Sequence, residues 1–271
     1  MKKISALFML LSVLFYGCEE VVEVDLSTQK PRLVVDAAID WTKGTDGSQQ
    51  TIRLTTTAAY YADNVPAVTG ATVFVTDSNA QVFDFIEDTG TGNYNCTNFA
   101  PVIGATYILT VIYEGQTYTA TETMIAVPEI TDIQQDNEGG FLGEDIEVRF
   151  YYPDDAASEN YYLEGFDSSV LPYPSYSVTS DEFVNGNLSF GIFSHEDLEA
   201  GDEIGIRLYG ISQRYFEYME KLLMISGGSG GPFGTAPATV RGNLVNQTDE
   251  SKYALGYFRL CEVDRTQFTI Q

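Results

Sequence analysis

The sequence is short of positive charge, of histidine and of cysteine. Its 271 residues include 14 lysines and arginines against 39 aspartates and glutamates, one histidine, one tryptophan and three cysteines. The excess of acid argues against nucleic acid as a partner, because phosphate would be repelled. Direct docking onto anionic lipid headgroups is disfavoured for the same reason.

Long hydrophobic runs are also missing. The longest uncharged, mostly apolar run is residues 4–15, and it follows Lys2 and Lys3. A membrane-spanning helix needs about 20 apolar residues, whereas a run of this length after a positive start is typical of a secretory signal peptide. We therefore expect residues 1–17 to be a signal peptide and the mature chain to have no transmembrane helix.

Cys18 follows this run directly, after Gly17. The segment L-F-Y-G-C resembles a bacterial lipobox, in which the cysteine receives a diacylglycerol and becomes the new N-terminus. Two or more acyl chains give stable anchoring, since each buried methylene contributes about 0.8 kcal/mol. We predict that Cys18 is lipidated and holds the protein to a membrane; a plain secretory peptide or a buried cysteine are the alternatives.

A burst of acid comes immediately after Cys18, with Glu19, Glu20, Glu23 and Asp25. This cluster resembles the export signal of surface lipoproteins in the Bacteroidota. We predict that Glu19 and Glu20 form a surface-export signal within an acidic tether over residues 18–31. The alternative is a solvated tether without a signalling role.

A period near two dominates residues 32–127. Short β-rich runs such as RLVVDAAID and TYILTVIYE are punctuated by turn residues, and Glu114-Gly115 marks a two-residue hairpin. Six or seven strands in under 100 residues predict an immunoglobulin-like β-sandwich. The expected fold class is mainly β: this N-terminal sandwich followed by a second β-rich domain that carries one amphipathic helix.

That second domain is expected over residues 128–271, after a linker around Pro128. Its strands are predicted at DIEVRFYYP, NYYLEGF, LSFGIF and EIGIRLYGI, with closing strands at ATVRGNLVN and YALGYFRLCEV. One helix is predicted near 213–226, because Tyr215, Tyr218, Met219, Leu222 and Leu223 form one apolar face. Ser212 is well placed to cap it.

Three groups of residues are candidates for reactive or metal sites. Residues 227–231, GGSGG, match the G-x-S-x-G pattern of hydrolases, but they follow a helix, and the only histidine precedes Ser229. His195 lies among Glu196, Asp197, Glu199, Asp202 and Glu203, and a second acidic group holds Asp154, Asp155 and Glu159. Neither group has the spacing of a calcium loop. We predict a glycine-rich loop and two solvated turns, with no catalytic residue, no metal and no cofactor.

The remaining cysteines and the tyrosine-rich segments leave alternatives open. Cys96 and Cys261 lie in different predicted domains, which favours two buried thiols over a disulfide. Segments RFYYPDD, NYYLEGF and LPYPSYS either pack the sheet or form an aromatic binding surface. Phe233, in GGPFG, either tucks onto its own domain or is a candidate contact for a partner.

Several landmarks together resemble a known family. They are KPRLVVDAAID, VTGATVFVTD, GNYNC, GATYILTVIYEGQTYTATE, YFEYMEKL, GGPFGTAPATVRGNLVN and ALGYF. The series resembles the Bacteroidota outer-membrane lipoproteins classed as domain of unknown function 4249. The most specific positions are Pro232, Phe233, Gly242, Asn243, Leu255, Gly256, Tyr257 and Phe258. The resemblance implies an envelope lipoprotein, typically encoded beside a TonB-dependent outer-membrane receptor, and it brings no catalytic residues.

The function expected from these features is that of a non-enzymatic, surface-exposed outer-membrane lipoprotein. It would be the accessory or ligand-capture partner of a TonB-dependent receptor, with an unnamed small molecule or glycan as ligand. An adhesin or carbohydrate-binding module is the alternative, and an envelope hydrolase the remote one.

Overall fold

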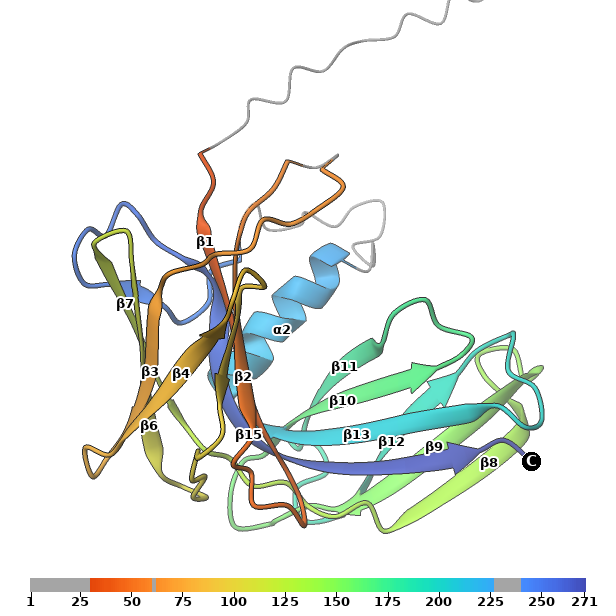
Figure 1. The fold of residues 1–271 in the computed structure, drawn as a ribbon. Coiled ribbons are helices and arrows are strands. Elements are labelled where there is room, and N and C mark those ends of the chain that lie inside the picture. Colours follow the sequence, from red (N-terminus) through yellow and green to blue (C-terminus); the bar gives the residue numbers. More distant parts are fainter. Residues whose placement is uncertain (1–29, 60–61, 227–239) are drawn as a thin grey trace, which may run out of the picture. The chain divides into compact units, whose positions relative to one another are not determined.

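The computed structural model describes residues 30–59, 62–226 and 240–271 (Figure 1). The described residues from 31 onward form one compact unit. Within the described residues no helix is long and apolar enough to cross a membrane. The elements are β1 (Leu33–Thr42), β2 (Gln50–Thr56), β3 (Thr72–Asp77), β4 (Val82–Asp88), β5 (Asn93–Cys96), β6 (Thr106–Tyr113), β7 (Gln116–Thr123), β8 (Asp132–Gly139), β9 (Asp145–Pro153), β10 (Tyr161–Ser168), β11 (Ser175–Ser180), β12 (Leu188–Ser194), β13 (Glu203–Ile211), α2 (Gln213–Ser226), β14 (Val245–Asn246) and β15 (Leu255–Thr269).

Strands β1 to β7 form a two-layered sandwich, which confirms the predicted β-sandwich class. Strands β1, β2 and β5 make one layer, and β4, β3, β6 and β7 make the other. Strand β4 pairs with both β5 and β3, so the two layers belong to one continuous sheet. Alternate side chains of both layers face inward and form one apolar core, with Val35, Ile39, Leu54, Val75 and Leu109 fully buried. The period of two that predicts strands is therefore the period of burial.

The predicted hairpin at Glu114-Gly115 is confirmed. Tyr113 pairs with Gln116 across it, and the two turn residues have φ angles of 49° and 71°. Positive φ at both central positions is the geometry of the tight turns that join twisted antiparallel strands.

The second part of the chain builds another pair of facing layers. Strands β12, β9 and β8 form a three-stranded sheet, which packs against β10, β13 and the end of β15. Phe150 and Phe166 meet between these layers, with ring centroids 5.8 Å apart. Strands β9, β10, β12 and β13 lie where the sequence predicts them. Strands β8 and β11 were not predicted.

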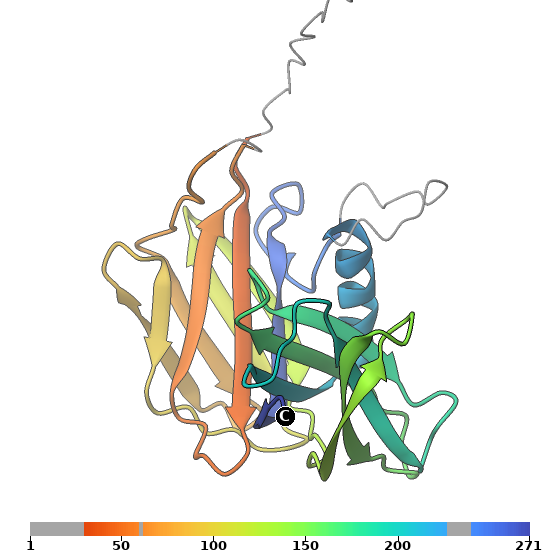
Figure 2. The ribbon, with the colours of Figure 1, turned by 90° about the vertical axis from the view of Figure 1, so that its right-hand side faces the viewer.

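The last strand, β15, runs through both parts of the molecule (Figures 1 and 2). Its first nine residues pair in parallel with β1, from Val34 opposite Leu255 to Thr42 opposite Val263. Its later residues pair antiparallel with β13. The segment at Pro128, predicted as a linker, also bonds to β15, because the backbone N–H of Glu262 donates to the carbonyl oxygen of Ile125 at 2.8 Å. Whether residues 32–127 fold as a separate domain stays a prediction.

Helix α2 follows β13 and lies over β10 and β11, in agreement with the helix predicted near 213–226 (Figure 1). Ser212 caps it, since the backbone N–H of Tyr215 donates to the Ser212 hydroxyl at 3.3 Å. Tyr215 and Met219 are its buried residues. They pack on the far face of β10, β13 and β15, away from the three-stranded sheet.

Candidate functional site

A groove lies between helix α2 and the sheet. It encloses about 420 Å³, and β1, β10, β11, α2 and β15 line it. Four tyrosines, Tyr176, Tyr215, Tyr218 and Tyr257, share it with Arg259. We call this the tyrosine groove.

The floor of the tyrosine groove contains Arg259, which forms a largely enclosed ion pair with Asp40. A guanidinium nitrogen of Arg259 lies 2.8 Å from Oδ2 of Asp40, and these side chains are 14% and 22% exposed. Arg259 also donates to the hydroxyl of Tyr215 at 3.2 Å. Burial by itself would lower the pKa of Arg259, but the Asp40 carboxylate, together with Tyr215, Cys261 and Tyr209, outweighs burial, and the pKa is raised. The arginine therefore stays charged, and its charge is already matched.

Three of the tyrosines stack into a compact aromatic wall. The ring of Tyr257 lies 4.8 Å, centroid to centroid, from both Tyr215 and Tyr218. Tyr215 and Tyr257 are buried, whereas Tyr218 is half-buried at the groove. Burial raises the pKa of Tyr215 to about 12, so its hydroxyl remains protonated at neutral pH. At the groove the wall offers chiefly the half-buried ring of Tyr218, an apolar face with a polar hydroxyl, which suits contact with a small amphipathic ligand.

Behind the wall, Tyr257 is fixed by a buried polar network. Its hydroxyl donates to Oε1 of Glu122 at 2.9 Å, and the side-chain amide of Asn243 donates to the same oxygen at 3.1 Å. Asn243 also bonds both backbone groups of Phe258, accepting from its N–H at 2.9 Å and donating to its carbonyl at 2.7 Å. The Asn243 side chain thus makes the two hydrogen bonds to Phe258 that the backbone of a neighbouring strand would otherwise make.

The glycines of the two closing landmarks allow this network to form. A side chain on Gly242 would collide with the carbonyl oxygen of Gly256, and one on Gly256 would collide with the carbonyl oxygen of Val35. Gly256 also has a φ angle of 90°, in the region that favours glycine. Gly242, Asn243, Gly256 and Tyr257 therefore position the back of the groove, whereas the sequence identified them only as landmarks.

Sequence reasoning missed Asp40 and Arg259 as a pair. A signal was present, because each is a charge flanked on both sides by apolar residues, in AAIDW and in YFRLC. Buried charges in such strands are nearly always paired. The pairing itself needs the parallel contact of β1 with β15, 219 positions apart along the chain.

The acidic groups that the sequence suggested as sites form hydrogen bonds within the protein. The Asp154 carboxylate accepts from the hydroxyl of Tyr162 at 2.7 Å and from the N–H of Gly186 at 2.8 Å. Nδ1 of His195 accepts from the N–H of Asp197 at 3.2 Å. Within the described residues no group of three histidine, cysteine or acidic side chains has the geometry of a metal site.

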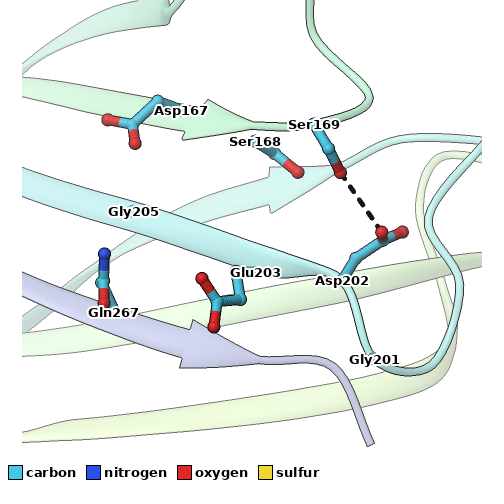
Figure 3. A pocket seen from close by; sticks show the side chains of 8 residues that line it. All are labelled: Asp167, Ser168, Ser169, Gly201, Asp202, Glu203, Gly205 and Gln267. Carbon is cyan, nitrogen blue, oxygen red and sulfur yellow. Dashed lines mark hydrogen bonds between the residues drawn. The ribbon is translucent and has the colours of Figure 1, made fainter.

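A shallow acidic hollow of about 480 Å³ opens where β10 and β15 end and β13 begins (Figure 3). Its carboxylates lie apart from one another and are partly used. Asp202 accepts from the Ser169 hydroxyl at 3.2 Å, and Asp167 pairs with Arg207 at 2.9 Å. The hollow lacks the converging ligands of a cation site, and we assign it no function.

A larger cavity, of about 680 Å³, lies beside the segment from Thr123 to Pro128. Residues 158–162 and 211–213 form its other side. Apolar atoms supply much of this lining, which includes Tyr161 and Tyr162, but none of the ion pairs of the described residues lies in it. The tyrosine groove is therefore the better candidate, although its cavity is smaller.

The predicted buried thiols are confirmed. Cys96 and Cys261 are both free and buried. Burial, reinforced by Asp40, raises the pKa of Cys261, so its thiol is unreactive at neutral pH. Its Sγ lies 3.2 Å from Oδ1 of Asp40, which adds a partner to the ion pair.

The tyrosine-rich segments mostly pack the sheets. Tyr152 and Tyr162 are buried with ring centroids 4.9 Å apart, and only Tyr176 of LPYPSYS reaches the groove. Cys18, Glu19, Glu20, Ser229, Pro232 and Phe233 lie outside the described residues, so the predictions made for them remain predictions.

The two facing layers define a β-sandwich protein. The model of one family, described as domain of unknown function (DUF4249), matches residues 19–267, and the chain belongs to that family. No curated protein matches.

Solved structures with similarity to the chain have low identity. A two-domain fibronectin type III segment of chicken tenascin is 9% identical, with a TM-score of 0.22, covering 67% of this chain and 91% of that one. A DUF4785 family protein from Legionella pneumophila is 8% identical, with a TM-score of 0.26, covering 66% and 52%. The fold assignment therefore rests on the sheets of this chain.

Proposed function

We propose that this protein is a lipid-anchored envelope protein that captures a small ligand in the tyrosine groove and presents it to a TonB-dependent receptor. The observation that carries the capture role is the groove itself, an aromatic wall held over a matched ion pair. It binds without a catalytic step, since the groove joins no nucleophile to a base.

The groove's chemistry limits its ligand. Its volume falls within the range of small-molecule sites, about 300–1,000 Å³. Asp36 is exposed at its edge, Arg259 is neutralised by Asp40, and the chain has a formal net charge of −25. An anion would be repelled, so the ligand is neutral or cationic, with an apolar or ring-shaped body that lies on the tyrosines.

The anchor and its orientation are supported by the sequence. Cys18 ends a signal-peptide-like run, and the acid at Glu19 and Glu20 follows at once. A receptor partner is supported by the resemblance of the chain to envelope lipoproteins that are typically encoded beside such receptors. These roles are independent of the groove and need their own test.

Fractionation of cells that express Cys18→Ala tests the anchor. Wild type should sediment with the outer membrane, and the variant should appear in the soluble fraction, because the acyl chains are its only attachment. A variant that is processed and still sediments with the membrane would contradict the anchor.

Protease added to intact cells tests the export signal. It should degrade wild type and spare Glu19→Ala/Glu20→Ala if the acidic residues direct export. Equal protection of both proteins would show that the acidic segment is only a tether.

Gentle extraction of the wild-type membrane tests the receptor. A TonB-dependent receptor should copurify with the full chain, and its identity can be read by mass spectrometry. Recovery of the lipoprotein without any such receptor, after crosslinking in intact cells, would remove that part of the proposal.

A carbohydrate-binding module is the second candidate, because tyrosine faces also suit the flat faces of sugar rings. Binding of the full chain on a glycan array, lost in Tyr218→Ala and found without a receptor, would favour it. The hydrolase alternative gains no support from the described residues.

A further inference from the structure

The two edges of the three-stranded sheet differ in how they are protected. Its order is β12, β9, β8, so β8 and β12 are both edge strands. Strand β8 carries Asp132, Asp136 and Glu138. Charges on an edge prevent another chain from adding to it, and β8 is protected in this way.

Strand β12 has no such protection. Its sequence, LSFGIFS, contains no charge and no proline. Leu188, Phe190 and Ile192 point outward and are 60%, 49% and 44% exposed, whereas the residues between them are buried. Among the described residues, backbone hydrogen bonds of β12 go only to β9. The strand is thus a free edge with an apolar outer face, the kind of edge that accepts a further strand.

We propose that β12 pairs with β12 of a second copy of this chain, antiparallel and centred on Gly191. This register places Phe190 of each copy opposite Ile192 of the other on the outer face. Phe190 and Ile192, an aromatic and a β-branched residue, make a favourable cross-strand pair. The two-fold axis between the copies produces this pair twice. The three-stranded sheets then join into one.

The charge distribution favours a second copy at this edge and not at the other. Pairing of β8 with itself would bring its carboxylates together, whereas pairing of β12 brings no like charges into contact. The net charge of −25 on each copy still opposes association over longer distances. Salt screens that repulsion, so the dimer should strengthen as ionic strength rises. This proposal does not rest on the proposed function.

Sedimentation velocity tests the proposal on the full chain, with Cys18→Ala in every sample so that acyl chains cannot associate. We expect a monomer–dimer equilibrium that shifts toward dimer with added sodium chloride. Ile192→Lys should weaken the dimer by at least about tenfold. Ile108→Lys is the matched control, because Ile108 is also 44% exposed but lies on β6, inside a sheet, and it should leave the dimer intact.

The double variant Phe190→Cys/Ile192→Cys tests the register without a destabilising charge. Under mild oxidation it should form a covalent dimer, since opposed residues approach disulfide distance, whereas positions 190 and 192 of one strand are too far apart to bridge. A wild type that is monomeric at every salt concentration, or equal weakening by both lysine variants, would overturn the proposal. A monomer that binds a lysine-flanked LSFGIFS peptide would also overturn it, and would assign the edge to a strand of another protein.

Discussion

The core between β1 and β7 is almost wholly apolar, whereas the part from β8 to β13 buries several carboxylates. In the described residues of the first part most buried side chains are aliphatic or aromatic. Gln50 and Thr55 are also buried, and Glu122, at the border with β15, is the one buried carboxylate. In the second part Glu147, Glu164 and Asp181 are each less than 9% exposed. The first part therefore depends on shape and apolar area, and the second depends also on protonation and pairing.

Some of the buried polar groups lie next to the tyrosine groove. Glu164 lies on β10 directly after Leu163. The Leu163 side chain is on the opposite face of that strand and lines the tyrosine groove. Glu122 and Asn243 hold Tyr257 from behind. A sandwich that only had to fold would not need these groups, because apolar replacements of buried ion pairs are often as stable.

The largest expected effect comes from Arg259→Met. Removal of the arginine leaves the Asp40 carboxylate enclosed without its partner, which should cost about 3–5 kcal/mol of unfolding free energy. Arg259→Met/Asp40→Leu should recover most of the loss, because no uncompensated charge remains. Denaturant unfolding measures both, and a double variant no more stable than the single would show that the pair acts through something other than charge.

Gly256→Ala should come next, at roughly 3–4 kcal/mol, because it combines a left-handed backbone with a collision at Val35. Gly44→Ala is the matched control. Gly44 has a φ of 78° and open space around it, so only the backbone cost of about 1–2 kcal/mol applies. If thermal unfolding gave equal losses of stability for Gly256→Ala and Gly44→Ala, the packing of β15 against β1 at Gly256 would be looser than described.

Glu164 should make the second part sensitive to pH. Burial raises its pKa from 4.5 to about 7, with Ser177 and Tyr152 donating to it. The unfolded chain releases this proton near pH 4.5 and the folded chain near pH 7, so stability falls across that window by about 3 kcal/mol and is constant above it. Glu164→Gln should remove this fall. Unfolding free energies of wild type and variant with the same pH profile would refute the assignment.

The smallest effect is expected in the first core. Ile52→Val removes one methylene from a fully buried position and should cost about 1 kcal/mol, with no change in pH profile. A loss that varies between pH 5 and pH 8 would show that the two parts are coupled more closely than their cores suggest.

Much of the fold could be predicted from the sequence, because burial alternates along most strands and α2 has a clear apolar face. Strand β8 was missed since DIQQDNEG is an edge with both faces largely exposed, and such a strand has no hydrophobic alternation. The groove could not be predicted. It depends on Ala38 and Arg259 becoming neighbours through the parallel pairing of β1 with β15, and the sequence shows no local signal for that pairing.

The central claim is that the tyrosine groove holds a ligand in the cell, and photocrosslinking tests it most directly. A benzoylphenylalanine in place of Tyr218, at the groove, should on irradiation of intact cells yield a small-molecule adduct visible in the intact mass of the purified chain. The same replacement at Tyr173, which is 81% exposed and away from the groove, should yield none. Absence of an adduct at position 218, or the same adduct at both positions, would contradict ligand capture by the groove.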